Sequence, residues 1–263
     1  MTAAGCDIVV LAGDRGPGDP LAASAGVAGK VLVPIGGRPM IERVLEAVAG
    51  ASATGRIVAV CPGSAAYLEV LSAHGVDERI DPGAGPAASA ASALERIVPG
   101  RAVLIVTGDH PLLRAEWLDS FIDSARSSGG DAVVGVVDHA AVQQRFPGHR
   151  RTHYRFSDRS VCGTNLFYVS DRRGRDVVAL WRGFEADRKK PWRIVARLGW
   201  WNLLRYASGR LTLRQATGAL SRRLGARIEA VLVEDAEAAV DVDSRADFRI
   251  VEDLLAKRAE GGA

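Results

Sequence analysis

Short apolar runs alternate with amphipathic stretches from residue 7 to about residue 138. Each apolar run has the length of a strand, and the stretches between them repeat apolar residues at helical spacing. This alternation is typical of βα units built on a mostly parallel sheet. We therefore predict an α/β fold with strands over residues 7–11, 56–61, 102–107 and 131–137.

Prolines mark two of the predicted helix starts. Pro39 precedes a segment with apolar residues on one helical face, and Pro86 opens a helix that runs to Ile97. A third helix is predicted over residues 116–126. The later elements are predicted in this order: a strand over 161–169, a helix capped by Ser170 and Asp171, a helical stretch over 191–224 broken at Gly199 and at 208–209, a strand over 228–233 and a final helix over 246–257.

The size and composition indicate one large folded unit. The chain has 263 residues, 48% of them hydrophobic, which is enough for a large core. Cys6, Cys61 and Cys162 are odd in number and far apart, so neither a disulfide framework nor a zinc site is indicated. No segment approaches the roughly 20 apolar residues that span a bilayer, and the N-terminus lacks a signal-peptide pattern. We expect a soluble, cytoplasmic protein with a single domain over residues 1–263.

The net charge of +3 conceals an uneven distribution. Residues 145–223 hold 19 Lys and Arg against 5 Asp and Glu, whereas the rest of the chain holds 15 against 26. A solvated basic face is one explanation. So large a local excess is more typical of a surface for an anionic partner, such as a phosphorylated substrate, an acidic membrane or a nucleic acid.

The first candidate site is the loop after the strand over residues 7–11. It begins at Gly13, continues through Asp14-Arg15-Gly16-Pro17-Gly18, and is followed by Lys30. Backbone N–H groups of such a loop, with a nearby amine, can wrap a polyphosphate. The sequence does not match a Walker A loop, because Val31 follows Lys30 where that motif has Ser or Thr. The spacing of the glycines also differs from that of the dinucleotide-binding fingerprint. A nucleotide site and an ordinary strand-to-helix connection are the two interpretations.

A second candidate is Asp109, which follows Gly108 directly after the strand over residues 102–107. This position lies at the carboxyl edge of the sheet, where open α/β folds bind ligands. Asp109 is thus a candidate metal ligand, although an aspartate that only caps the next turn is the commoner case. The adjacent His110 is predicted to be structural.

A third candidate is the pair Asp241 and Asp243, which strand-like alternation sends to one side of an extended segment. Mg²⁺ prefers one or two carboxylates together with substrate phosphates and water. We expect one of the pair to bind Mg²⁺ with Asp109 and the other to cap the last helix, where Ser244 is an alternative cap.

Four segments in sequence order resemble the molybdopterin guanylyltransferase-like (MobA-like) superfamily of nucleotidyltransferases. They are Leu11-Ala12-Gly13, KVLVPIGGRPM over residues 30–40, TGDHPL over residues 107–112 and VDVDS over residues 240–244. The resemblance implies a Rossmann-like three-layer α/β/α fold, shared with type-A glycosyltransferases, with a helical basic insertion. We divide the domain into three regions: a nucleotide-binding half over 7–138, a basic, partly helical acceptor region over 145–226, and a closing strand, metal motif and helix over 227–258.

The resemblance also implies roles for individual residues. The catalytic residues would be Lys30, Asp109 and Arg15, and the metal ligands Asp109, Asp241 and Asp243. The nucleotide would lie against Leu11, Ala12, Gly13, Asp14, Gly16, Lys30 and Gly108, with its base near Gly85 and Ser89. The loop departs from the family pattern because Asp14 replaces a glycine, an Arg-Met pair is missing, and sixteen residues separate Gly13 from Lys30. Arg15 is the candidate substitute for the missing arginine.

The basic segment is expected to bind the acceptor. Clustered arginines suit bidentate phosphate binding, and Gly163-Thr164-Asn165 resembles the acceptor-contacting strand of sugar nucleotidyltransferases. The expected acceptor-binding residues are Arg150, Arg151, Arg155, Asn165, Arg188, Lys189 and Lys190.

The expected activity is Mg²⁺-dependent nucleotidyl transfer. An acceptor phosphate oxygen attacks the α-phosphorus of an NTP, and pyrophosphate leaves. The acceptor phosphate is ionised near neutral pH, its second pKa being about 6, so no dedicated base is required. CTP and a phosphorylated polyol or alcohol are favoured. The alternatives are a nucleotide-sugar glycosyltransferase, which would usually show a second acid after Asp109, and a non-catalytic module that binds nucleotide or another anion.

Residues 192–206 are unusually aromatic and include Trp192, Trp200 and Trp201. Core packing is the expected role of most of these side chains, because apolar residues surround the helix. The alternative is contact of residues 188–206 with a membrane surface or a lipid-like acceptor. No nucleic-acid-binding motif is present, and no nucleic-acid partner is expected.

Overall fold

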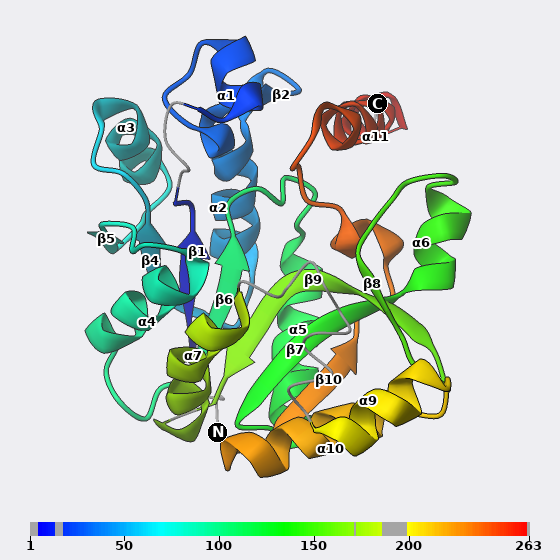
Figure 1. Cartoon of the computed structure of the whole chain (residues 1–263). Coiled ribbons are helices and arrows are strands. Elements are labelled where there is room, and N and C mark those ends of the chain that lie inside the picture. Colours follow the sequence, from blue (N-terminus) through cyan, green and yellow to red (C-terminus); the bar gives the residue numbers. More distant parts are fainter. Residues whose placement is uncertain (1–4, 14–17, 171, 186–198, 262–263) are drawn as a thin grey trace.

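The computed structural model describes residues 5–13, 18–170, 172–185 and 199–261 (Figure 1). Its centre is a mixed sheet with the strand order β10-β7-β9-β6-β1-β4-β5, and β8 pairs with β9. The strands of this sheet are β1 (Cys6–Leu11), β4 (Thr54–Val60), β5 (Glu78–Ile80), β6 (Val103–Thr107), β7 (Ala132–Asp138), β8 (His153–Arg155), β9 (Ser160–Val169) and β10 (Ile228–Leu232). A small antiparallel ribbon joins β2 (Pro34–Ile35) to β3 (Arg38–Pro39).

Helices cover both faces of the sheet. They are α1 (Pro20–Ala25), α2 (Met40–Gly50), α3 (Ala65–Ala73), α4 (Pro86–Arg96), α5 (Ala115–Ser128), α6 (His139–Arg145), α7 (Arg172–Glu185), α9 (Trp200–Ala207), α10 (Leu213–Leu224) and α11 (Arg245–Gly261), with the 3-10 turns η1 (Lys30–Leu32) and η2 (Ala236–Ala239). Every residue of β1 is buried, as expected for a strand covered on both faces. Ile8 and Val10 pack with α2 and α5, whereas Val9 and Leu11 pack with α4. The predicted three-layer, mostly parallel α/β fold is confirmed.

The basic segment contributes a strand to the middle of the sheet. β9 lies between β6 and β7 and runs antiparallel to both. The pairs β1–β4, β1–β6, β4–β5 and β10–β7 are parallel. Because β9 runs against its neighbours, its early residues approach the edge at which β6 and β7 end. The predicted insertion is thus part of the sheet and not only a peripheral elaboration.

The helical character predicted for residues 191–224 is confirmed in its described part, which contains α9 and α10 with a break at Ser208-Gly209. The expected core packing is wrong for two of its aromatic residues. Trp200 and Trp201 are 70% and 77% exposed. Among the described residues, Tyr206 of α9 packs with Phe156, Leu211 and Ala216 in a small cluster that does not include Trp200 or Trp201. Trp192 lies outside the described residues.

In the part of the chain that the structure describes, no helix is both long and apolar enough to cross a membrane.

Candidate functional site

Three charged side chains meet at the carboxyl edge of β1 and β6. Lys30, in η1, lies with its Nζ 2.5 Å from Asp109 Oδ2 and 2.8 Å from Asp243 Oδ1. Asp109 follows β6, and Asp243 follows η2, so residues far apart in the sequence converge at one edge. The lysine and Asp109 are largely buried, and Asp243 is half-exposed.

Close backbone packing brings these segments together. The Gly108 N–H donates a hydrogen bond to the Leu11 carbonyl at 2.8 Å. A Cβ on Gly108 would lie 3.1 Å from the Cβ of Ala12 and 3.3 Å from Val31, so a glycine here lets η1 approach Asp109. The late acidic segment is attached to the same edge, because the Val242 N–H donates to the Asp109 carbonyl at 2.9 Å.

The two carboxylates keep Lys30 charged. Burial by itself would lower the pKa of Lys30, but the adjacent Asp109 and Asp243 outweigh it and raise the pKa above the ordinary value of 10.5. Asp109 Oδ1 is buried and has no hydrogen-bond partner among the described residues. Burial lowers the pKa of the neighbouring His110, so this ring is neutral.

Asp241 has different partners from Asp243. Its Oδ2 accepts a hydrogen bond from Asn165 Nδ2 at 2.7 Å, and its Oδ1 forms an ion pair with Arg151. Asn165, in β9, has a φ of 58°, in the left-handed region that asparagine tolerates better than most residues. Burial would lower the pKa of Arg151, but the adjacent Asp241 outweighs it and raises the pKa, so the guanidinium is charged.

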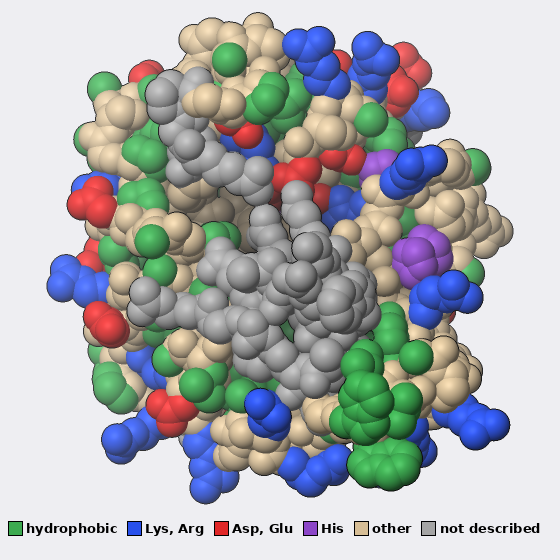
Figure 2. Space-filling view, viewed as in Figure 1, with side chains coloured by type: hydrophobic (Ala, Val, Ile, Leu, Met, Phe, Trp, Pro, Cys, Tyr) green, Lys and Arg blue, Asp and Glu red, His purple; other side chains and the backbone are tan. Residues whose placement is uncertain are grey.

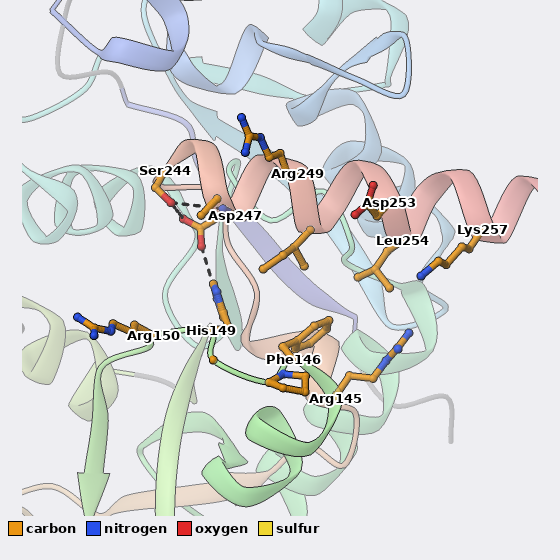
Figure 3. A pocket seen from close by; sticks show the side chains of 14 residues that line it. Arg145, Phe146, His149, Arg150, Ser244, Asp247, Arg249, Asp253, Leu254 and Lys257 are labelled. Atoms are coloured by element: carbon orange, nitrogen blue, oxygen red, sulfur yellow. Dashed lines mark hydrogen bonds and ion pairs between the residues drawn. The ribbon is translucent and has the colours of Figure 1, made fainter.

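A groove of about 860 Å³ runs between α11 and the segment that joins α6 to β8 (Figure 3). Phe146, His149 and Arg150 line one side, and side chains of α11 line the other. His149 Nε2 lies 3.4 Å from Asp247 Oδ1 on the other side. Because Ser244 and Arg150 belong to the groove and adjoin Asp243 and Arg151 in sequence, the groove opens next to the acidic edge.

Residues 8–232 match the family model of the MobA-like NTP transferase domain, which is most of the chain. The chain belongs to this family. It is therefore a nucleotidyltransferase, and the resemblance seen in the sequence is confirmed.

Solved structures and a curated protein are similar to this chain. A hypothetical transferase from Thermus thermophilus is 32% identical to this NTP transferase, with a TM-score of 0.77 over 93% of this chain and 99% of the other. CMP:2-keto-3-deoxy-manno-octonic acid synthetase, in complex with CTP, is 15% identical and shares the fold, with a TM-score of 0.62 over 97% and 100% of the two chains. The bifunctional protein GlmU of Bdellovibrio bacteriovorus is 36% identical over 114 residues, which are 41% of this chain and about a quarter, 24%, of that protein.

The predicted metal ligands of this NTP transferase do not form one cluster. Asp109 and Asp243 share Lys30, whereas Asp241 binds Arg151 and Asn165. Within the described ranges, no group of three or more His, Cys, Asp or Glu side chains is arranged to hold a metal ion. The donor that fits a hard cation is Asp109, because its buried Oδ1 is a carboxylate oxygen without another partner.

The expected helix cap is also corrected. Neither Asp241 nor Asp243 caps α11. Ser244 Oγ accepts a hydrogen bond from the Asp247 N–H at 3.3 Å, and Asp247 Oδ2 accepts from the Asp243 N–H at 3.2 Å. The signal in the sequence is Ser-Arg-Ala-Asp over residues 244–247, which has the spacing of a capping box. Ser244 supplies the cap, and the Asp243 carboxylate pairs with Lys30.

The segments predicted for the nucleotide lie near one another. A Cβ on Gly13 would be 3.4 Å from Pro82, so the end of β1 contacts the turn that precedes α4. Gly85 is the N-cap of α4, and Ser89 Oγ accepts a hydrogen bond from the Gly83 N–H at 3.0 Å. Ser89 is buried, so its hydroxyl orders this turn. Asp14, Arg15 and Gly16 lie outside the described residues.

The predicted acceptor residues are divided among different places. Arg151 and Asn165 contact Asp241, and Arg150 lines the groove. Arg155 is exposed, and its backbone N–H donates a hydrogen bond to Tyr206 Oη on α9 at 3.3 Å. Arg188, Lys189 and Lys190 lie outside the described residues.

Sequence reasoning missed a buried carboxylate that holds the late segment in place. Glu237, in η2, forms ion pairs with Arg114, Arg145 and Arg258, which come from three different parts of the chain. No local pattern marks Glu237, because its three partners are brought to it by the fold. It positions η2, which precedes Asp241 and Asp243.

Proposed function

We propose that this NTP transferase is a Mg²⁺-dependent enzyme that transfers an NMP from an NTP to a phosphorylated small molecule. The observation that carries the proposal is the position of Lys30, held between Asp109 and Asp243 at the edge where β1 and β6 end. Family membership supports an NTP as the donor. The reaction joins an acceptor phosphate oxygen to the α-phosphorus, and the bond to the bridging oxygen breaks so that pyrophosphate leaves.

Each charged side chain has a role in this proposal. Lys30 places a fixed positive charge beside the triphosphate. Asp109 would hold Mg²⁺ through its unpartnered Oδ1, with Asp243 or Asp241 as a further ligand. When bound, the ion would offset the charge that develops on the phosphates. Arg15, Leu11, Ala12, Gly13 and Gly108 complete the proposed nucleotide contacts, with the base near Gly85.

The acceptor is proposed to enter from the groove beside α11. Arg150 lines this groove, and Arg151 reaches Asp241 from the next position in the chain. Arginine suits the bidentate binding of a phosphate. An Arg150→Ala variant should therefore raise the KM for the acceptor and leave the KM for the NTP unchanged. Arg223→Ala, an exposed arginine on α10, is the matched control.

CTP is the favoured donor, and a phosphorylated polyol or alcohol the favoured acceptor. The synthetase solved with CTP shares the fold of this chain, which supports CTP as the first nucleotide to test. A cytoplasmic location is also proposed, because Cys6, Cys61 and Cys162 are free and buried. The membrane contact expected through residues 188–206 concerns a different surface, at α9 (Figure 1).

The test is pyrophosphate release from each of the four NTPs with Mg²⁺ and a panel of phosphorylated alcohols. Asp109→Asn should lower kcat by about 10²-fold or more in a protein that remains folded. Asp123→Asn changes an exposed carboxylate on α5 and serves as the control. Full activity of Asp109→Asn, or release of pyrophosphate with no NMP joined to the acceptor, would overturn the proposal.

A further inference from the structure

The outer surface of α9 is apolar and exposed. Trp200 and Trp201 are 70% and 77% exposed, and Leu204 is 41% exposed. Leu204 follows Trp200 by four positions and Trp201 by three, so the three side chains adjoin on the helix surface. Figure 2 shows hydrophobic side chains gathered at the lower right, where α9 lies in Figure 1. We call Trp200, Trp201 and Leu204 the α9 patch.

The chain around the α9 patch is strongly basic. Residues 199–224 contain five arginines and no Asp or Glu. All five, Arg205, Arg210, Arg214, Arg222 and Arg223, are exposed. Asp158 contacts this segment from outside it, where its Oδ1 accepts a hydrogen bond from the Leu213 N–H at 3.0 Å. The segment therefore presents exposed aromatic rings together with an excess of positive charge.

We propose that α9 and α10 form a docking surface for an anionic membrane. Tryptophan side chains prefer the interface between lipid and water, where the ring meets acyl chains and the indole N–H meets polar groups. Arginines beside such an anchor attract the phosphates of acidic lipids. The proposal is independent of the transfer reaction, because none of these side chains belongs to the acidic edge around Lys30.

Charge and side-chain type favour a membrane over a second copy of the chain or a nucleic acid as the partner of this surface. If two copies of the chain met through their α9 patches, Arg205, which follows Trp201 by four positions on the helix, would face its copy, and this repulsion opposes association. A nucleic acid would attract the arginines and could stack on the indoles, but Leu204 has no ring to stack and favours hydrocarbon. An anionic lipid surface satisfies both the apolar and the basic part.

The experiment is co-sedimentation of the full chain with vesicles of phosphatidylglycerol and phosphatidylcholine, and with vesicles of phosphatidylcholine alone. The chain should bind the anionic vesicles at low salt, and binding should fall as salt is added. The double variant W200S/W201S should bind these vesicles with an affinity at least about tenfold lower than that of the wild type. The control L68S/V98S alters apolar side chains that are 46% and 64% exposed elsewhere and should bind like the wild type.

A charge variant tests the second part of the surface. R210Q/R214Q should reduce binding to anionic vesicles and flatten its dependence on salt. Thermal unfolding of all variants checks that each is folded. The proposal is overturned if the wild type does not bind anionic vesicles at low salt, or if the folded W200S/W201S variant binds them unchanged. Binding of single-stranded oligonucleotide in place of vesicles, or a dimer that W200S/W201S abolishes, would also overturn it.

Discussion

Asn165 Nδ2 donates a hydrogen bond to Asp241 Oδ2 at 2.7 Å, and it does so from a left-handed backbone conformation. The two residues are 76 positions apart in the chain. The antiparallel strand β9 is thereby joined to the acidic segment that follows η2. The carboxylate of Asp241 is oriented by this amide and by Arg151, and not by Lys30.

Two variants of Asn165 separate orientation from backbone strain. Asn165→Gly and Asn165→Ala both remove the amide, so both should lower kcat/KM about tenfold if Asp241 must be oriented. Only alanine is strained at this φ, so it should be about 1 kcal/mol less stable than the glycine variant. Steady-state kinetics and urea unfolding measure the two effects. Equal stability of the two variants would show that the backbone relaxes here.

Lys30→Met should lower kcat by about 10²-fold or more, because it removes the charge proposed to lie beside the triphosphate. The pKa of Lys30 is raised above 10.5, so the ammonium is protonated at neutral and mildly alkaline pH. The loss should therefore have the same size throughout the range of about pH 6 to 9. A loss that disappears at the alkaline end would contradict the charged state of Lys30.

Asp241 and Asp243 should differ in their effect on stability. Asp241→Ala leaves the Arg151 guanidinium, whose side chain is only 14% exposed, without its partner, and should cost about 2 kcal/mol or more. Asp243→Ala removes a carboxylate whose side chain is 51% exposed, and Asp109 still pairs with Lys30, so it should cost less than about 1 kcal/mol. Urea unfolding at neutral pH compares them. Costs of the same size would mean that the Arg151 pair is not important for stability.

Glu237→Gln should destabilise the fold by about 2 to 4 kcal/mol at neutral pH, because three arginines lose their buried counter-charge. Arg114 and Arg145 each lie 2.9 Å from its carboxylate, and Arg258 forms the third ion pair with it. Burial would raise the pKa of Glu237, but Arg145, Arg258 and Arg114 outweigh it and lower the pKa below the ordinary 4.5.

The lowered pKa of Glu237 gives this prediction a pH dependence. Its contribution to stability is complete above pH 4.5, the ordinary value, and is lost as the pH falls through the lower value of the folded state. The difference in unfolding free energy between wild type and Glu237→Gln should therefore shrink as the pH falls below 4.5. A difference that stays constant through this range would assign the effect to packing instead of charge.

The long elements could be predicted from the sequence because periodicity over many residues leaves little ambiguity. The strand and helix predicted around residues 102–107 and 116–126 correspond to β6 and α5. Short elements were not predicted. β5 has three residues, all of them half-buried and two of them charged, so it has no apolar run to recognise. It forms because β4 presents an edge for it to pair with.

The sequence by itself determined the chemistry of the candidate site, because Lys30, Asp109 and Asp243 each belong to a local motif that resembles the family. Only the tertiary structure decided which groups meet. Ion pairing depends on approach within a few ångströms, and that approach is set by the order of β9 between β6 and β7 and by packing at Gly108. For the same reason, the sequence could not show that Asp241 pairs with Arg151 and not with Lys30, or that Trp200 is exposed. Whether a side chain is apolar or charged is a local property, whereas its burial and its ion-pair partners depend on the whole fold.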